Sequence, residues 1–370
     1  MKVLVTGGAG FIGSHTVDAL MDRGYDVTIL DSLEKPVHLK GKPDYLNPKA
    51  GFIQADVRSR NDMLNALDGA EAVIHLAAYQ DYLPDFSKFF SVNSVATALI
   101  YELIVEKKLP IKKVVVASSQ AVYGEGKYLC DKDGIVYPDI RPESQLRAGD
   151  WDIKCPVCGE KAQHQLTDES VVNPQNQYAV SKYTQELISL NLGRRYEIPT
   201  ACLRYSIVQG PRQSFYNAYS GACRIFCLNM YFDRQPTVYE DGESLRDYIN
   251  IQDVVDANLL VLEKPEADFG VFNVGGGRAY TVVEFAKIVA ERFRKDIEPK
   301  IPGYYRFGDT RHIFSDISAL ESLGWKPKVS IEKSVDDYIN YLNEQTDVED
   351  ILDYAEKKMK TLNVVREARK

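Results

Sequence analysis

The sequence predicts an α/β protein built on a Rossmann-type doubly wound parallel sheet, and three observations support this fold class. The chain opens on Val3, Leu4 and Val5, an apolar run without polar alternation, which is typical of a parallel strand buried on both faces. Glycines at the spacing G-x-x-G-x-x-G follow, and a helical pattern comes after them. At 370 residues the chain exceeds one typical core, so we expect two lobes.

Composition narrows the class of protein. Hydrophobic residues make up 45% of the chain and charged residues 26%, as in ordinary soluble globular proteins. The net charge of −8 argues against nucleic acid as a partner, and no apolar run approaches the ~20 residues of a membrane span. The N-terminus enters a strand without a basic leader, and six cysteines are too few for a disulfide scaffold. We therefore expect a cytoplasmic protein with no membrane partner.

The glycine loop is the first candidate site. Its three glycines supply a tight turn, close approach to a pyrophosphate and close helix packing: Gly7, Gly10 and Gly13. The helix expected over residues 15–23 offers free N–H groups to the phosphates. The next strand ends at Asp31, where a carboxylate would hold the adenine ribose hydroxyls and repel a 2′-phosphate. These features predict NAD rather than NADP; the alternative is a structural βαβ unit that binds nothing.

Further polar residues close the following strands at the same sheet edge. Residues 51–55 form a strand that ends at Asp56, which we place near the adenine ring. The strand over residues 72–75 ends at His75, for which a structural role is favoured over a catalytic one. The cofactor residues expected from these patterns are Gly7, Gly10, Phe11, Ile12, Gly13, Asp31, Ser32, Asp56, Val57, Leu76, Ala77 and Ala78.

The remaining elements follow from apolar spacing and chain breakers. We expect helices over residues 61–67, 91–107, 177–195, 251–263 and 281–294, and a surface helix without chemistry over residues 347–369. Strands are expected over residues 113–117, 200–205, 237–239 and 271–274, with a loop over residues 206–213. The aromatic and polar stretch 79–90 leaves the carboxyl edge of the sheet, so it is placed on the substrate side of the pocket.

Residues 125–170 are polar and proline-bearing and do not fit the sheet pattern. They contain Cys130 and the knuckle Cys155-Pro-Val-Cys158-Gly159, in which two thiolates sit on a tight turn. A tetrahedral zinc ion needs a fourth ligand, for which Asp133 and His164 are the candidates. The prediction is a structural zinc site; the alternative is a loop with exposed thiols.

The candidate catalytic residues are Ser119, Tyr178 and Lys182. Tyr178 and Lys182 stand at i and i+4 on one helix face. A tyrosine needs a pKa shift of about 3 units from ~10, or roughly 4 kcal/mol, to act as a base at neutral pH. A nearby lysine ammonium and a positive nicotinamide ring favour the phenolate, and Ser119 would orient the substrate hydroxyl. This set predicts proton abstraction from an alcohol coupled to hydride transfer to NAD⁺, rather than an ordinary helix surface.

Five motifs occur in the order Thr6-Gly-Gly-Ala-Gly-Phe-Ile-Gly13, His75-Leu-Ala-Ala78, Ser118-Ser-Gln-Ala-Val-Tyr-Gly124, Tyr178-x-x-x-Lys182 and Arg246-Asp-Tyr-Ile249. Together they resemble the extended short-chain dehydrogenases/reductases, and more narrowly the NAD-dependent nucleotide-sugar epimerase/dehydratase family. The resemblance implies a Rossmann domain over residues 1–206, a smaller substrate-binding lobe over 207–345 and the C-terminal surface helix over 346–370. It also implies tightly held NAD, a nucleotide-diphosphate sugar as substrate and a homodimer.

The resemblance also implies roles for individual residues. Arg246 and Arg306 match diphosphate-binding arginines, Tyr205 matches a tyrosine beside the nicotinamide, and Asn93 matches a cofactor-proximal asparagine. The resulting substrate-binding candidates are Gln80, Asp81, Tyr82, Ser119, Gln120, Arg212, Asn217, Arg246 and Arg306.

Three departures from the family pattern refine the expected reaction. Gln120 and Ala121 stand where dehydratases carry an acid pair, which disfavours dehydration, and Ile207 replaces an asparagine of many 4-epimerases. The cysteine insertion resembles the branch that contains dTDP-L-rhamnose 4-epimerases. We therefore expect epimerisation, at carbon 4, through a transient keto sugar. The alternatives are a dehydratase, a reductase, an epimerase acting at another carbon, and a non-catalytic NAD-binding scaffold.

Overall fold

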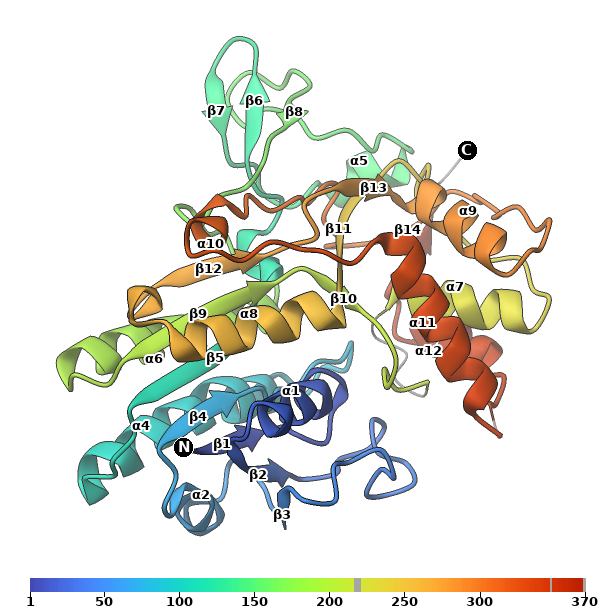
Figure 1. Cartoon of the computed structure of the whole chain (residues 1–370). Coiled ribbons are helices and arrows are strands. Elements are labelled where there is room, and N and C mark those ends of the chain that lie inside the picture. Colours follow the sequence, from blue (N-terminus) through green and yellow to red (C-terminus); the bar gives the residue numbers. More distant parts are fainter. Residues whose placement is uncertain (216–220, 347, 369–370) are drawn as a thin grey trace.

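A seven-stranded parallel sheet forms the centre of the protein in a computed structural model that describes residues 1–215, 221–346 and 348–368 (Figure 1). Its strands run in the order β12-β9-β5-β4-β1-β2-β3. Their bounds are β1 Lys2–Thr6, β2 Asp26–Asp31, β3 Gly51–Gln54, β4 Ala72–His75, β5 Lys113–Ser119, β9 Thr200–Tyr205 and β12 Val271–Val274. Because all seven strands are parallel, their carboxyl ends meet at one edge, where such sheets bind ligands. The predicted fold class is confirmed.

A second lobe packs around a separate hydrophobic core. It contains a mixed three-stranded sheet, β10 Ile207–Gln209, β11 Leu245–Asn250 and β13 Ala279–Thr281, in that order. Its helices are α7 Ala222–Tyr231, α9 Val282–Arg292 and α11 Ile331–Glu344. Short helices, η3 Pro265–Ala267 and α10 Ser318–Ser322, lie in the connections. β12 returns from this part of the chain to the edge of the large sheet.

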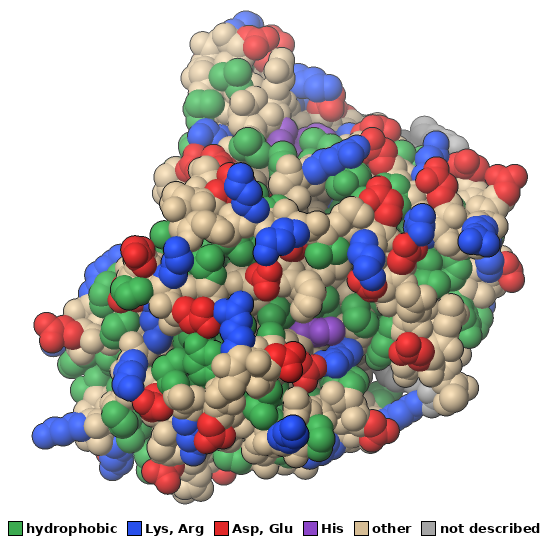
Figure 2. Space-filling view, in the orientation of Figure 1, with side chains coloured by type: hydrophobic (Ala, Val, Ile, Leu, Met, Phe, Trp, Pro, Cys, Tyr) green, Lys and Arg blue, Asp and Glu red, His purple; other side chains and the backbone are tan. Residues whose placement is uncertain are grey.

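The cysteine-bearing insertion projects from the body as a small three-stranded sheet (Figures 1 and 2). Its elements are β6 Tyr128–Cys130, β7 Gly134–Val136, β8 Gln163–His164 and the short helix α5 Glu143–Arg147. A two-stranded sheet joins β14 Tyr304–Arg306 to β15 Val365–Glu367, which follows α12 Leu352–Thr361 near the C-terminus. Figure 2 shows acidic and basic side chains interspersed over this face of the molecule.

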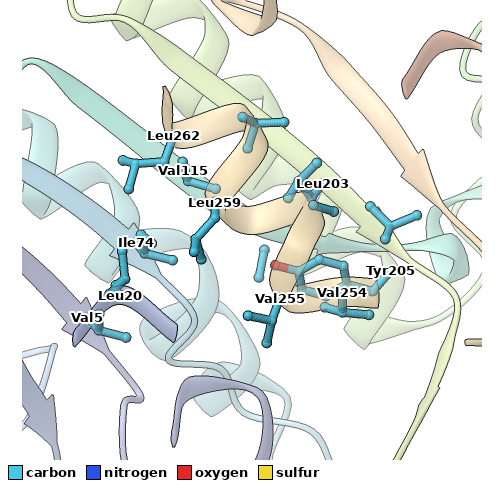
Figure 3. Close-up of a cluster of buried hydrophobic side chains, with 14 of the residues drawn as sticks. Val5, Leu20, Ile74, Val115, Leu203, Tyr205, Val254, Val255, Leu259 and Leu262 are labelled. Atoms are coloured by element: carbon cyan, nitrogen blue, oxygen red, sulfur yellow. The ribbon is translucent and has the colours of Figure 1, made fainter. Parts of the chain in front are cut away.

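Helices cover both faces of the large sheet. α1 Phe11–Asp22 and α8 Ile251–Glu263 pack on one face, and α2 Arg60–Leu67, α4 Ala96–Lys107 and α6 Gln177–Arg195 on the other. Figure 3 shows Val254, Leu259 and Leu262 of α8 beside Val115 and Leu203 of the strands. Each such fully buried side chain stabilises the fold by about 1.5–3 kcal/mol relative to its exposed state.

Several elements differ from their prediction. α1 begins at Phe11 rather than at residue 15. The prediction started the helix too late because Gly13 and Ser14, which have low helix propensity, lie inside it. The helix expected from residue 91 is preceded by α3 Phe86–Phe89 and a π-helical turn, Phe90–Val95. The expected strand 237–239 is a single bridge from Thr237 to Lys300, and the expected loop 206–213 contains β10. The expected terminal helix is short, because residues 365–367 pair with β14 instead.

One helical stretch, Phe86–Lys107, is long and apolar enough by composition to cross a membrane, which the sequence prediction did not anticipate. In the structure, 56% of its apolar window is buried inside the protein. Tyr101, Leu103 and Ile104 lie in the core beneath the large sheet, so this stretch serves as a core helix of the fold.

Candidate active site

A cleft of about 330 Å³ opens at the carboxyl edge of the large sheet. Every residue that the sequence patterns assigned to the cofactor lines this cleft, and so do Tyr178, Lys182 and Tyr205. Asn93 is the one predicted cofactor residue that does not line it. Residues at or just after the ends of six strands, together with the first turns of α1 and α6, therefore form one continuous site, as the topology requires.

The glycine loop fits a dinucleotide pyrophosphate. A Cβ atom on Gly7, whose φ is +69°, would lie 2.7 Å from the backbone nitrogen of Ala77, and one on Gly13 would lie 2.1 Å from the carbonyl oxygen of Gly7. Side chains at these positions would clash with the backbone, so the two glycines allow the tight turn and the close packing of α1 against the loop. No side chain caps the N-terminus of α1 at Gly10, so its backbone N–H groups stay available to an anion.

Asp31 is held in place at the end of β2. Its Oδ2 accepts a hydrogen bond from the backbone N–H of Ala9 at 3.0 Å, and its Oδ1 accepts one from Leu33 at 2.9 Å. The Nε2 of His38, a residue the sequence reasoning missed, lies 3.9 Å from Oδ1. Arg58 also lines this end, but its guanidinium is occupied by Asp56. A fixed carboxylate with no unpaired arginine beside it fits a ribose diol better than a 2′-phosphate.

Tyr178 and Lys182 enter the cleft from the first turns of α6, whose N-cap Asn176 accepts a hydrogen bond from Ala179 at 2.9 Å. The Lys182 side chain is buried, and its Nζ donates to Gln185 Oε1 at 2.8 Å. Burial lowers the pKa of Lys182 to about 7, while the charge of Glu186 acts to raise it. Its proton is therefore exchangeable near neutral pH.

The side chain of Ser119 takes part in a local hydrogen bond at the edge of the site. It ends β5 next to the cleft-lining Ser118, and its Oγ accepts a hydrogen bond from the backbone N–H of Ala121 at 3.2 Å as the cap of the 3₁₀ turn Gln120–Tyr123. Ser119 itself does not line the cleft.

His75 has the structural role that the sequence favoured. Its ring is fully buried and hydrogen-bonds Thr6 Oγ1 at 2.6 Å and Thr97 Oγ1 at 3.0 Å. Burial lowers the pKa of His75 to about 3, so it stays neutral.

Asn93 contacts the site through its neighbours. It lies in the π-helical turn, where its Oδ1 accepts a hydrogen bond from the N–H of Tyr79 at 2.7 Å. Its Nδ2 donates to the carbonyl of Tyr79 at 3.1 Å and to Ser181 Oγ at 2.9 Å. Asn93 thus positions the loop after β4 against the helix that carries Tyr178 and Lys182.

The predicted substrate residues divide into two groups. Gln80 and Asp81 line the cleft, together with Gln213 and Ser214, which the sequence reasoning missed. The others lie outside its lining or, in one case, outside the described residues: Tyr82, Ser119, Gln120, Arg212, Arg246 and Arg306 do not line it, and Asn217 falls in the segment that is not described.

The three arginines have protein partners in this structure. Arg212 pairs with Asp18 at 2.7 Å. Arg246 donates to the carbonyls of Thr310 and Arg311, at 2.9 and 3.1 Å. Arg306 pairs with Asp309 and donates to the hydroxyl of Tyr82 at 2.5 Å. Sequence spacing could not reveal the partners Asp18, Thr310, Arg311 and Tyr82, because each is at least 64 residues from its arginine in the chain.

The insertion brings three cysteines and one carboxylate together. The donor atoms of Cys130, Asp133, Cys155 and Cys158 all lie within 4.8 Å of one another. Cys130 Sγ is 3.5 Å from Cys158 Sγ, and Asp133 Oδ2 is 3.1 Å from Cys155 Sγ. Tetrahedral zinc with Zn–S bonds of about 2.3 Å places sulfurs roughly 3.8 Å apart, so the donor set fits zinc. His164 is outside the cluster, with its ring against Tyr128 and His312; as a fourth ligand it is therefore wrong.

Comparison with known proteins agrees with this geometry. The sequence model of the NAD dependent epimerase/dehydratase family matches residues 3–145 and 155–275. The chain is 32% identical to dTDP-L-rhamnose 4-epimerase of Burkholderia thailandensis over 353 residues, which cover 94% of this chain and 96% of that protein. It is 33% identical to a putative UDP-glucose 4-epimerase of Methanocaldococcus jannaschii, covering 92% and 98%.

Solved structures show the same similarity. The crystal structure of UDP-glucose 4-epimerase from Thermotoga maritima with UDP-glucose superimposes with a TM-score of 0.76 at 31% identity, covering 93% of this chain and 99% of that one. UDP-glucose 4-epimerase from Thermus thermophilus in complex with NAD gives 0.72 at 27%, covering 94% and 100%. The glycine loop, the Tyr178–Lys182 pair and these matches together place the chain in the NAD-dependent epimerase/dehydratase family.

Proposed function

We propose that the protein is an NAD-dependent epimerase of a nucleotide-diphosphate sugar acting at carbon 4. The observation that carries the proposal is the entry of Tyr178 and Lys182 into the cleft that also contains the glycine loop and Asp31. The printed names of the similar proteins, dTDP-L-rhamnose 4-epimerase and UDP-glucose 4-epimerase, support the choice of reaction.

Tyr178, Lys182 and Ser119 have separate roles in the proposed reaction. NAD, when bound, would accept a hydride from carbon 4 and return it. The phenol oxygen of Tyr178 takes the proton of the 4-hydroxyl, and the Lys182 ammonium stabilises the phenolate that must form first. Turning of the 4-keto sugar in the pocket exposes its other face, and Tyr178 then gives the proton back. The predicted task of Ser119 is to orient the sugar hydroxyl.

Two neighbouring reactions fit less well. A dehydratase needs an acid and a base beside the catalytic serine, and Gln120 and Ala121 supply neither group. A net reductase would release its nicotinamide product in each cycle, and the printed names of the similar proteins, which are 4-epimerases, do not favour such a reaction. An epimerase acting at another carbon would differ by exchanging a carbon-bound hydrogen with solvent.

The test is incubation of the purified protein with a panel of UDP-, dTDP-, GDP- and CDP-sugars, with the stereoisomers resolved by chromatography. We expect one or a few of these to equilibrate with their carbon-4 epimers without added NAD and without NADH release. Failure to epimerise any member of the panel, or stoichiometric NADH release, would contradict the proposal.

We further propose that Cys130, Asp133, Cys155 and Cys158 hold a structural zinc ion. Bound zinc would fold the insertion, whose own hydrophobic core is small, and it takes no part in hydride transfer. From the family resemblance we also propose a homodimer in the cytoplasm, which light scattering and cell fractionation would test.

A further inference from the structure

A second cavity of about 370 Å³ lies between the second lobe and the C-terminal segment, defined here as residues 348–368. Its size falls in the range of small-molecule sites. Six of its lining residues represent the elements around it: Ile225 and Asn229 of α7, Thr237 and Tyr239, Tyr304 of β14, and Met359 of α12. The cavity combines these aromatic, aliphatic and amide groups with the charged side chains of Arg234, Lys300, Asp353, Glu356 and Lys360, a mixture that suits a planar heterocycle with apolar faces and polar edges.

Arg306 lies between this cavity and the catalytic cleft. Its guanidinium is 5.0 Å from the ring centre of Tyr239, which lines the second cavity. The same guanidinium donates to Tyr82, the residue after the cleft-lining Asp81. A cation with a sugar site on one side and an aromatic cavity on the other matches the order sugar, diphosphate, nucleoside along a nucleotide sugar.

The C-terminal segment is fixed to the lobe on several sides. Ile351 and Ala355 are buried, and Ile351 belongs to the core of the second lobe. Arg234 pairs with Asp350 at 2.6 Å and with Asp353 at 2.7 Å. β15 pairs with β14, the strand that ends in Arg306. This anchoring sets Met359 against the cavity, while Tyr354 of the same helix is 64% exposed.

The segment also contacts the catalytic cleft. Lys358 Nζ lies 3.9 Å from Oδ1 of Asp81, whose side chain is only 9% exposed. Asp81 lines the cleft on the substrate side. Consecutive residues of α12 therefore meet both regions: Met359 lines the cavity, and Lys358 pairs with the cleft.

We propose that the C-terminal segment forms one wall of the nucleoside end of the substrate site, with Met359 as a specificity-determining contact for the base. The proposal rests on the proposed function for the identity of the ligand. The Lys358–Asp81 pair joins this wall to the sugar end, so nucleoside binding is linked to the loop that follows β4.

The test is calorimetric titration of the holoenzyme with UDP and with dTDP. Met359→Trp fills the cavity and should weaken binding of the better diphosphate by about tenfold or more, the size of effect that a small shape change produces in such pockets. Tyr354→Trp makes the matched change on the exposed side of α12 and should bind as the wild type does. NAD content should stay near wild type in both variants, and kcat should stay near wild type in Tyr354→Trp.

Two further measurements test the proposal if the Met359→Trp protein does not fold. Met359→Ala should change the ratio of UDP to dTDP affinity, and hydrogen exchange of α12 in the wild type should slow when UDP or dTDP binds. Unchanged affinities in both Met359 variants, or no protection of α12, would contradict the proposed contact between the C-terminal segment and the nucleoside. The epimerase proposal would not be affected by either result. If the wild type with full NAD binds neither diphosphate and epimerises no nucleotide sugar, the proposed function itself is contradicted. The proposed role of the C-terminal segment in nucleoside binding is then contradicted too.

Discussion

Asn93 Nδ2 donates a hydrogen bond to Ser181 Oγ at 2.9 Å, and that hydroxyl in turn donates to the carbonyl of Tyr178 at 2.8 Å. The π-helical turn Phe90–Val95 is thereby joined to the start of α6 through Ser181, the residue directly before Lys182. A π turn inside a longer helix is often found at a functional site. Here it places the buried Asn93 amide against the helix that carries Tyr178 and Lys182.

Replacing Asn93 should therefore disturb catalysis without removing a catalytic group. Asn93→Ala leaves the N–H and carbonyl of Tyr79 unpaired, at a cost of about 1–3 kcal/mol of stability. We expect a lower kcat, with Thr184→Ala on the exposed side of α6 as the unaffected control. Ser181→Ala removes the hydrogen bonds to Asn93 and to the carbonyl of Tyr178 but leaves those between Asn93 and Tyr79, so it should have the smaller effect. An Asn93→Ala enzyme with full kcat would contradict this positioning role.

Tyr178→Phe should abolish turnover while leaving cofactor and nucleotide sugar bound. The phenol oxygen moves a proton, so its loss removes transition-state stabilisation more than binding; loss of a general base typically costs about 10²–10⁴-fold in rate. Rate assays measure the loss of turnover, and calorimetric titration measures the binding of the cofactor and the nucleotide sugar. Near-normal epimerisation by the variant would transfer the role of base to another cleft residue, with Asp81 the first to examine.

Lys182 should make the stability of the cofactor-free protein depend on pH. Burial lowers its pKa to about 7 in the folded state, against about 10.4 in an unfolded chain. Between these values the unfolded state binds more protons, so stability rises with pH across this window, and the full cost of charging the buried amine is present below pH 7. A shift of about 3 units corresponds to at most roughly 4 kcal/mol.

Lys182→Met removes this titration. The variant should be inactive but more stable than the wild type at pH 6, and the difference should shrink toward pH 10. Urea unfolding at several pH values measures it. A constant difference in the free energy of unfolding across this range would contradict the lowered pKa.

Zinc binding should depend on Asp133 and not on His164. We expect about one zinc per chain in the wild type and in His164→Gln, by elemental analysis. Asp133→Ala and Cys155→Ser should lose affinity by more than the roughly 10–100-fold that removal of an outer-shell partner costs. Cys223→Ala, outside the cluster, is the matched control. Full zinc retention by Asp133→Ala would exclude it as the fourth ligand.

The sequence predicted those parts of the site that depend on local spacing. The glycine loop, Asp31 after β2 and the Tyr178–Lys182 pair are each set by a few consecutive residues, and the fold brings all of them into one cleft. Helix α6 and strands β4, β9 and β12 were also predicted with their observed bounds, because strong apolar or helical patterns define them.

The features that the sequence did not predict depend on contacts between residues that are far apart in the chain. Residues 237–239 have strand-like composition, but only Thr237 meets a partner, at Lys300. β15 exists because β14 lies beside it, and Arg246 is directed by carbonyls about 65 residues away. Asp133 and His164 were both candidates by spacing; the structure gathers Asp133 with the three cysteines and leaves His164 outside that group.

The most direct test of the central claim follows deuterium placed at carbon 4 of the substrate found in the sugar panel. The account predicts that both epimers keep the deuterium at carbon 4 after equilibration, with none lost to water and none gained from D₂O at the neighbouring carbons. Loss of the label to solvent, or incorporation of solvent deuterium at carbon 3 or carbon 5, would contradict epimerisation through a 4-keto sugar.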